Sequence, residues 1–255
     1  MASNKIVRFL RHGQAAHNVN AEAMRAAGCS YDEFLSAMAA DDVFDAALTP
    51  LGREQAAVAG RSPACLRAAR TVELVVASPL SRAIDTADLC FPAPTLAAAE
   101  DALWGARRAV PRLVKEEARE ISGLLLNGKR RTRTELAALY PHWEMGALVE
   151  DEDAHWVAVG GSAQLEEDAS TARRAHKLLA WVWDRPERDV VVVAHGGLFH
   201  LLANGANSNT TDTDTDPSPA VEACEGVKQR FANCELRSCR LEAMEGRFRL
   251  SLLSN

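Results

Sequence analysis

Two hydrophobic runs in the chain have the pattern of β-strands that end in polar turns. Lys5–Leu10 is rich in β-branched and aromatic residues, and Asp189–Ala194 contains four consecutive valines, the pattern of a fully buried strand. Each run is followed within two residues by a histidine-glycine pair, His12-Gly13 and His195-Gly196. A third short apolar run, Glu73–Ala77, is also interpreted as a strand.

Helical periodicity fills much of the sequence between these strands. An alanine-rich helical pattern extends from Val19 to Asp42 and is interrupted at Gly28. Apolar residues recur at helical spacing between Leu165 and Val182, ahead of Pro186. A further helix is expected after His195. The strands and helices therefore alternate along the chain.

Two helix starts are predicted from a serine or threonine that precedes a proline. Thr49-Pro50 places an N-cap residue before a proline at the first helical position, and Ser78-Pro79 repeats this signature. The second start places Arg82 near a helix N-terminus.

The end of the chain predicts a β-hairpin. Cys234–Leu241 and Arg247–Leu253 alternate with period two on either side of Glu245-Gly246. Alternating strands and helices before this hairpin imply a parallel arrangement covered on both faces. We therefore predict an α/β protein, a three-layer α/β/α sandwich with a mainly parallel central sheet.

The chain length fits one domain with an excursion and a loop. It has 255 residues, 47% of them hydrophobic, and we expect a single domain over 1–255. The pattern weakens over about 91–161, where prolines punctuate short segments, and a cap-like excursion over the sheet is expected there. Its basic cluster, Lys129–Arg133, is interpreted mainly as a solvated face. Residues of about 204–219 are polar and low in complexity, which predicts a flexible surface loop.

Composition limits the classes of binding partner and the cellular compartment that we expect for the protein. The net charge is −6, which gives no basis for binding nucleic acid, and no apolar run is long enough to span a membrane. The first predicted strand starts too near Met1 for a signal peptide, so a cytoplasmic protein is expected. Six cysteines without a Cys-x-x-Cys pair are interpreted as reduced thiols. Nothing in the sequence indicates an oligomeric state.

Candidate chemistry gathers where the predicted strands end. The first strand offers Arg11 and His12, the second delivers Arg82 and the third presents His195. Ligands of open α/β sheets bind beyond the carboxyl ends of the strands. Two guanidinium groups and two imidazoles at that edge suit a phosphoryl group, because arginine binds phosphate bidentately and histidine acts as a nucleophile or donor.

These segments resemble the histidine phosphatase superfamily, which includes the cofactor-dependent phosphoglycerate mutases. The resemblance spans nearly the whole chain and rests on the order of its motifs. The motifs are Arg11-His12-Gly13-Gln14, Ser78-Pro79-Leu80-Ser81-Arg82-Ala83 and Ala194-His195-Gly196-Gly197, with support from Asn18, from Asp45–Gln55 and from Phe231–Leu236.

The resemblance implies a phosphoglycerate mutase-like fold and a covalent mechanism on His12. The imidazole attacks phosphorus, and water then hydrolyses the phosphohistidine. No metal and no cofactor is implied. The residues implied to hold the phosphoryl oxygens are Arg11, Arg82 and His195, assisted by Asn18 and by a backbone amide of Gly13 or Gly196. His195 is counted with His12 among the catalytic residues.

The leaving oxygen requires a proton, and in this superfamily an acidic residue before a glycine supplies it. The matching stretch here is Lys115–Gly123. Glu120 aligns best as the general acid, and Glu117 is the second candidate. The remaining histidines, namely His17, His142, His155, His176 and His200, are interpreted as structural or surface residues.

Two alternatives to a histidine phosphatase stay open, and a third, a cysteine phosphatase, is disfavoured. A phosphoglycerate mutase needs the same residues, but its motif continues with Glu-Ser where this chain has Gln14-Ala15. A non-catalytic phospholigand-binding protein would keep the arginines and lose the acid. A cysteine phosphatase needs Cys-x5-Arg in a glycine-rich loop, and that spacing occurs without such a loop at Cys224–Arg230 and at Cys234–Arg240. A small phosphorylated molecule is the expected substrate, with a phosphoprotein as the alternative.

Overall fold

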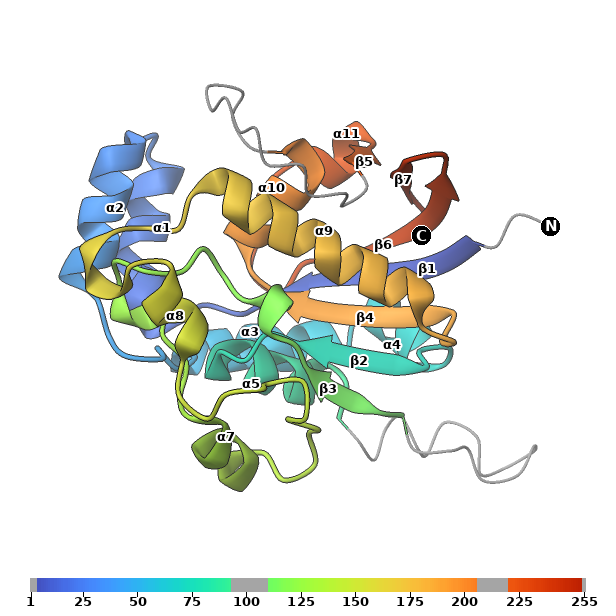
Figure 1. Ribbon diagram of the computed structural model, residues 1–255, viewed down its shortest axis with the longest axis horizontal. Helices are drawn as coiled ribbons and strands as arrows, with labels where there is room; N and C mark the ends of the chain where they lie inside the picture. The colour runs from blue at the N-terminus through green and yellow to red at the C-terminus, as the bar shows by residue number, and fades with distance from the viewer. Residues whose placement is uncertain (1–3, 93–109, 206–219, 254–255) are drawn as a thin grey trace.

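The computed structural model describes residues 4–92, 110–205 and 220–253, whose strands form one seven-stranded sheet (Figure 1). The strand order is β3-β2-β4-β1-β6-β7-β5. Four neighbouring pairs are parallel, while β1–β6 and β6–β7 are antiparallel. The strands are β1 (Asn4–Arg11), β2 (Leu74–Ala77), β3 (Arg112–Val114), β4 (Asp189–Ala194), β5 (Ala220–Ala223), β6 (Leu236–Met244) and β7 (Arg247–Leu252). A mainly parallel sheet and the terminal β6–β7 hairpin are therefore confirmed.

Helices cover both faces of this sheet, as Figure 1 shows. The longer helices among the described residues are α1 (Val19–Ala26), α2 (Tyr31–Ala40), α3 (Pro50–Gly60), α4 (Pro63–Ala69), α5 (Ser81–Cys90), α7 (Arg133–Leu139), α9 (Asp168–Asp184) and α10 (Gly196–Asn204). Shorter ones are α8 (Ala154–Ala158) and α11 (Glu225–Lys228). The predicted break at Gly28 separates α1 from α2, and Thr49 caps α3 by accepting a hydrogen bond from Gly52 N at 3.0 Å.

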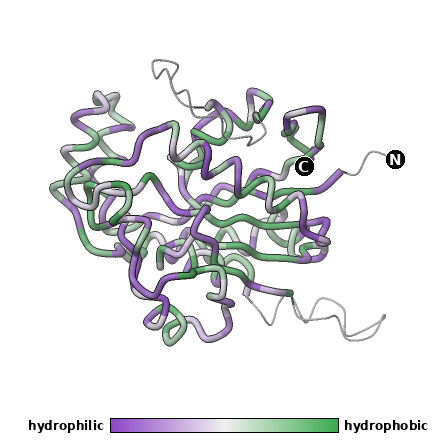
Figure 2. The backbone as a smooth tube through the Cα atoms, viewed as in Figure 1, coloured by the Kyte–Doolittle hydropathy of each residue, from purple (hydrophilic) through white to green (hydrophobic). Residues whose placement is uncertain are grey.

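The valines of β4 show how the three layers pack. Val190 and Val192 belong to a core cluster with α9 and α10. Val191 and Val193 belong to a second cluster with α3, α4 and α5. Successive side chains of a strand point to opposite faces, so the four consecutive valines contribute to both cores. Figure 2 shows the central strands as a hydrophobic band inside the more polar helices. The α/β/α sandwich is confirmed.

Four parallel strands bring their carboxyl ends to one edge of the sheet. β1 ends at Arg11, β2 at Ala77 and β4 at Ala194, as the sequence predicts. The fourth strand, β3, lies inside the segment expected to form only an excursion, and it pairs with β2. Its carboxyl end leads into η2 (Glu116–Ala118) and on to Glu120. The acidic stretch thus reaches the same edge as the histidines.

The expected N-cap role of Ser78 is wrong. Helix α5 begins at Ser81, and its N-cap residue is Leu80. Ser78 is fully buried at the strand end, where its hydroxyl contacts His195 and accepts a hydrogen bond from Leu80 N. The carboxylate of Asp45, from a distant loop, instead accepts from Ser81 N (2.9 Å) and from its hydroxyl. Arg82 nevertheless lies in the first turn of α5, as predicted.

The basic cluster Lys129–Arg133 is mostly structural rather than solvated. Arg130 is buried. Its guanidinium donates to four backbone carbonyls, those of Arg131, Glu150, Asp151 and Glu152. Arg131 pairs with the Asp45 carboxylate at 3.0 Å. Arg130 fixes the loops of the excursion, because its guanidinium supplies several donors to backbone carbonyls.

Parts of two expectations fall outside the described residues. They are residues 93–109 of the excursion and residues 206–219 of the expected flexible loop. Across the described ranges, the structure contains no helix that is both long and apolar enough to cross a membrane.

Candidate active site

A cavity of about 320 Å³ lies at the edge of the sheet where the parallel strands end. It is lined by most of the residues that the sequence selects. These are Arg11, His12, Asn18, Glu120 and Gly196. Arg82 and His195 are fully buried and do not line it. The structure therefore brings five of the seven candidates to the cavity surface and keeps the other two beneath it.

The His12 ring is held in one tautomer. Its Nδ1 lies 2.6 Å from the Gly13 carbonyl oxygen, and since a carbonyl only accepts, Nδ1 carries the proton. The other nitrogen, Nε2, then keeps its lone pair. Burial lowers the pKa of His12 well below 6.5, and the charges of Arg82 and Arg11 lower it further. His12 is therefore a neutral imidazole at neutral pH.

Beneath His12, two buried side chains have polar atoms without a partner among the described residues. Arg82 donates from one Nη to Asn127 O at 2.8 Å, but its Nε and second Nη are unpaired. His195 Nε2 contacts the Ser78 hydroxyl at 2.8 Å, and its Nδ1 is unpaired. Its ring centroid lies 5.0 Å from that of His12. Buried polar groups are normally satisfied, so this cluster is typical of a site that receives an anion.

The charge of Arg82 affects the whole cluster. Burial lowers its pKa to about 10, while Glu120 and Asp45 raise it in part, so Arg82 stays charged at neutral pH. Its charge contributes to the lowered pKa of three buried histidines, His12, His17 and His195, after burial itself. Burial and this fixed cation together therefore keep the surrounding imidazoles neutral.

Arg11 is partly committed to neighbours. One Nη donates to the Phe231 carbonyl at 2.7 Å, and the other pairs with the Glu22 carboxylate. Its buried Nε has no partner within the described part of the chain. This Nε lies 3.2 Å from the position that a Cβ on Gly196 would occupy, so only glycine leaves the space between them open.

Asn18 and Gly196 frame the cavity from two helix starts. Asn18 Oδ1 accepts a hydrogen bond from Ala15 N at 3.0 Å, which turns the amide NH₂ away from that loop. Gly196 is the first residue of α10, where backbone N–H groups point out of the helix. Helix N-termini of this kind favour anions.

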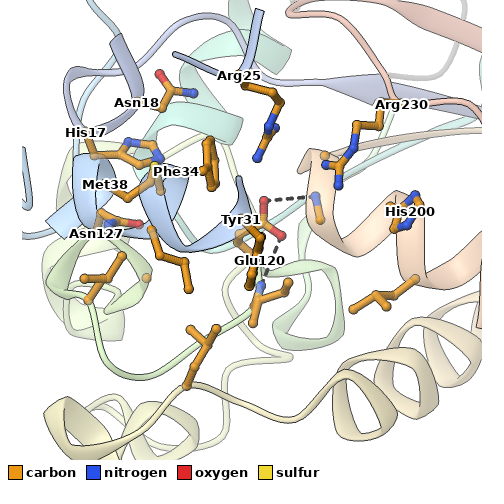
Figure 3. Close-up of a pocket in the computed structure, with 18 of the residues that line it drawn as sticks. His17, Asn18, Arg25, Tyr31, Phe34, Met38, Glu120, Asn127, His200 and Arg230 are labelled. Carbon is orange, nitrogen blue, oxygen red and sulfur yellow. Dashed lines mark hydrogen bonds between the residues drawn. The ribbon is translucent and has the colours of Figure 1, made fainter. Parts of the chain in front are cut away.

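The Glu120 carboxylate already occupies that helix start. Glu120 accepts hydrogen bonds from Leu198 N (3.0 Å), Gly197 N (3.2 Å) and its neighbour Ile121 N (3.1 Å). Figure 3 shows it at the centre of the cavity. Glu117 instead pairs with Lys115 at 3.1 Å and does not line the cavity. The geometry thus favours Glu120 over Glu117 as the acid.

A buried ionic network fixes the backbone at Glu120. Arg174 of α9 donates to the carbonyls of Arg119 (2.7 Å) and Glu120 (3.2 Å), and it pairs with the buried Glu166. Arg119 is fully buried and forms a bidentate pair with Asp153. Both carboxyls have a lowered pKa because these hydrogen bonds outweigh burial.

The loop that carries His12 is clamped from a second element. Gln14 N donates to Gln55 Oε1 (2.9 Å), and Thr49 Oγ1 donates to Gln14 Oε1 (2.8 Å). An ideal Cβ on Gly52 would lie 1.9 Å from Gln14 O, so the two backbones touch. The Asp45–Gln55 stretch therefore has a physical role in positioning the histidine loop.

The C-terminal segment closes the same loop from the opposite side. Asn233 Nδ2 donates to the His12 carbonyl at 3.0 Å. Cys234 N donates to the Arg11 carbonyl at 3.1 Å, with Cys234 in a left-handed conformation. Cys234 is buried against the loop while Arg240 is exposed on β6, so this Cys-x5-Arg spacing forms no phosphate loop.

Two histidines that the sequence assigns to structure or surface line the cavity. His17 is 3% exposed, its Nδ1 has no partner among the described residues, and its ring centroid lies 6.2 Å from that of His12. His200 of α10 also lines the cavity, on the side of Arg230 (Figure 3). The available signal for His17 was its place in the same polar loop, directly before Asn18.

Comparisons with known proteins identify one superfamily for this chain. A model of the histidine phosphatase superfamily (branch 1) matches residues 39–216. Two relatives from Arabidopsis thaliana cover 92% of this chain. One is phosphoglycerate mutase-like protein 1, 30% identical over 249 residues that make up 80% of its length. The other is a phosphoglycerate mutase-like protein, 28% identical over 252 residues and 83% of its length.

Solved structures share the fold at low sequence identity. The mycobacterial glucosyl-3-phosphoglycerate phosphatase in complex with VO₃ superposes with a TM-score of 0.51, at 20% identity over 98% of both chains. This structural similarity shows a shared fold only. Family membership is shown by the family model and by the plant relatives. The chain therefore belongs to the histidine phosphatase superfamily, in its first branch.

Proposed function

We propose that the protein is a phosphatase that hydrolyses a phosphomonoester through a phosphohistidine on His12. The observation that carries the proposal is the 2.6 Å contact between His12 Nδ1 and the Gly13 carbonyl oxygen. The Nδ1–H of the ring is committed to the Gly13 carbonyl, so a neutral Nε2 is available as the nucleophile. Superfamily membership and a solved phosphatase of this fold support the same class of reaction.

The unpaired groups around His12 would bind the phosphoryl oxygens. Arg82 offers Nε and one Nη, Arg11 offers Nε, and His195 offers Nδ1, each without a partner among the described residues. The Asn18 amide and the Gly196 N–H complete the cradle. Cations and N–H donors fixed in a buried site offset the negative charge of the transition state with little reorganisation.

In the first step, His12 Nε2 attacks phosphorus, and the bond between phosphorus and the leaving oxygen breaks. Glu120, acting as the general acid, donates a proton to that oxygen, and the alcohol leaves. In the second step, water attacks the phosphohistidine and Glu120 takes up its proton. The P–N bond breaks, its electron pair returns to Nε2, and inorganic phosphate is released.

The proposed substrate is a small phosphomonoester. The cavity volume of about 320 Å³ is at the lower end of the usual range for small-molecule sites. A phosphoprotein would have to present its phosphoryl group at a recessed nucleophile, since His12 is only 2% exposed. No cofactor enters the proposed steps.

The experiment is phosphate release from p-nitrophenyl phosphate and from an alkyl phosphate, with EDTA, for wild type and two variants. His12→Ala should abolish release from both esters. Glu120→Gln should slow the alkyl ester far more, because p-nitrophenolate leaves without protonation. Equal losses on both esters would exclude the acid role.

The same assay separates the alternative activities. Isomerisation of 3-phosphoglycerate in the presence of 2,3-bisphosphoglycerate, without net hydrolysis, would indicate a mutase. Phosphate binding without any turnover would indicate a non-catalytic phospholigand-binding protein. Release that survives His12→Ala would overturn the proposed nucleophile.

A further inference from the structure

Helix α2 carries an apolar stripe that no core covers. Its large apolar residues are Tyr31, Phe34, Leu35 and Met38, spaced as i, i+3, i+4 and i+7. This spacing is typical of a helix face packed on a hydrophobic core. Yet α2 contains no buried residue, and none of the four belongs to either core cluster. All four line the cavity that holds His12.

The cavity has a second apolar wall. It is formed by Ile121, Leu125, Leu165 and Leu201, from three separate parts of the chain. Leu165 is half-buried and bridges to Gly123, which places it beside the Glu120 loop. The phosphate-binding floor therefore continues into a space between two apolar walls. Inorganic phosphate alone would leave most of its 320 Å³ or so empty.

The stripe is held by a stacked cation. The Arg25 guanidinium lies 3.5 Å from the Phe34 ring centroid, and its Nη1 is 3.5 Å from the Glu22 carboxylate. Tyr31 stacks beside Phe34 at 6.5 Å. Figure 3 shows Arg25 and Arg230 extending toward Glu120 above these rings. Phe34 therefore has one face against Arg25, and its stripe faces the cavity.

Several of the polar groups that line the cavity are engaged with one another, while Arg230 and Asp168 also line it. Glu22 pairs with Arg11 and Arg25, and Asn204 bonds to His200 on the same helix turn. A substrate rich in hydroxyls would have to break such bonds, whereas an apolar group would only displace water from the walls.

We propose, on the basis of the proposed function, that the alcohol portion of the substrate is an apolar, ring-sized group. It packs between the stripe of α2 and the wall at Leu165 while its phosphate sits at His12. Full burial of one phenyl ring, about 100 Å² of apolar surface, corresponds to a gain in affinity of roughly seventyfold, and partial burial gives proportionately less.

The test compares two non-hydrolysable ligands with the same phosphonate group, propylphosphonate and 3-phenylpropylphosphonate. Calorimetry measures the Kd of each for the full-length protein. The ring is remote from phosphorus, so the Kd ratio reports the walls and not the chemistry. We expect the phenyl ligand to bind at least about tenfold more tightly.

Variants on both walls locate the effect. Phe34→Ala and Leu165→Ala should each reduce the Kd ratio several-fold and leave propylphosphonate unchanged. Phe34→Leu should keep most of the ratio. Leu66→Ala is the matched control, because Leu66 is an exposed apolar residue of α4 outside the cavity, 46% exposed. Circular dichroism confirms that each variant is folded.

The outcomes separate this inference from the proposed function. A wild-type ratio near one, or a ratio that both wall variants leave unchanged, would overturn the apolar subsite. Release of phosphate from propyl phosphate, dependent on His12, would still support the phosphatase in that case. Conversely, the expected ratios without any turnover would keep the subsite and overturn the phosphatase.

Discussion

At the scale of single residues, the site is defined by imidazoles that burial keeps neutral. His12, His17 and His195 are each at most 3% exposed, and burial is the largest cause of their lowered pKa. A neutral imidazole is a nucleophile only through the nitrogen without a proton. The Gly13 carbonyl therefore determines which nitrogen of His12 would attack phosphorus in the proposed mechanism.

The first prediction concerns the pH dependence of turnover. Because the pKa of His12 lies well below 6.5, the nucleophile stays unprotonated where a free imidazole would be half charged. The acid limb of kcat/KM should therefore fall below pH 6.5. Measurements with two phosphate esters that differ in the second pKa of their phosphate group distinguish titration of the enzyme from titration of the substrate. An enzyme limb at or above pH 6.5 would contradict the buried neutral ring.

The second prediction concerns His17. His17→Phe should lower kcat/KM about tenfold, since it removes a cavity-lining donor near His12. The same change should leave the free energy of unfolding equal or higher by about 1 kcal/mol, because a buried nitrogen without a partner costs stability. His142→Phe, at an exposed position, is the control for both measurements. A loss of stability together with activity would indicate a structural role.

Some of these site residues could be predicted from the sequence and others could not. Arg11, His12 and His195 could be predicted because a strand pattern and a motif coincide at each. His17 could not, since only the folded chain brings its ring beside His12. The cap of α5 could not be predicted either, because Asp45 from a distant loop supplies it in place of Ser78. Sequence patterns describe local partners, and these contacts are long-range.

At the scale of elements, the loop that carries His12 depends on α3. The start of this helix packs backbone to backbone against Gln14, which only a residue without a side chain permits. β3 has a comparable role for Glu120, since it carries the acidic stretch to the common edge. It was missed because a three-residue strand at a sheet edge has too little periodicity to detect.

The third prediction follows from this packing. Gly52→Ala should lower the free energy of unfolding by about 1–3 kcal/mol, the usual cost of overpacking. It should also lower kcat, because the histidine loop must move away from α3. Gly146→Ala is the matched control, since an added Cβ there meets nothing within 4 Å. Unchanged kcat in Gly52→Ala would show that the loop is positioned independently of α3.

At the scale of the whole molecule, the neutral histidines couple folding to pH. Their pKa is lowered in the folded state, so below pH 6.5 the unfolded chain binds protons that the folded chain does not. Stability is therefore complete above pH 6.5 and declines as the pH falls below it. The carboxyls with a lowered pKa, such as Glu166 and Asp153, act only at more acidic pH.

The fourth prediction concerns how steeply the free energy of unfolding depends on pH. Between pH 6.5 and pH 5, the free energy of unfolding should fall by up to about 4 kcal/mol per pH unit, roughly 1.4 for each of three histidines. Urea titrations at constant ionic strength measure it. His17→Phe should remove about one third of the slope. A stability that does not change over this range would mean that the three rings take up protons in the folded state.

The position of β1 in the sheet has a consequence for biosynthesis. This first strand lies between β4 and β6, both of which come from the last third of the chain, and Asn233 and Cys234 hold its terminal loop. A nascent chain leaving the ribosome thus exposes an apolar strand whose partners have not yet been made. Truncated translation products that lack β6 should therefore leave the loop of His12 without these partners, and we expect them to depend on chaperones.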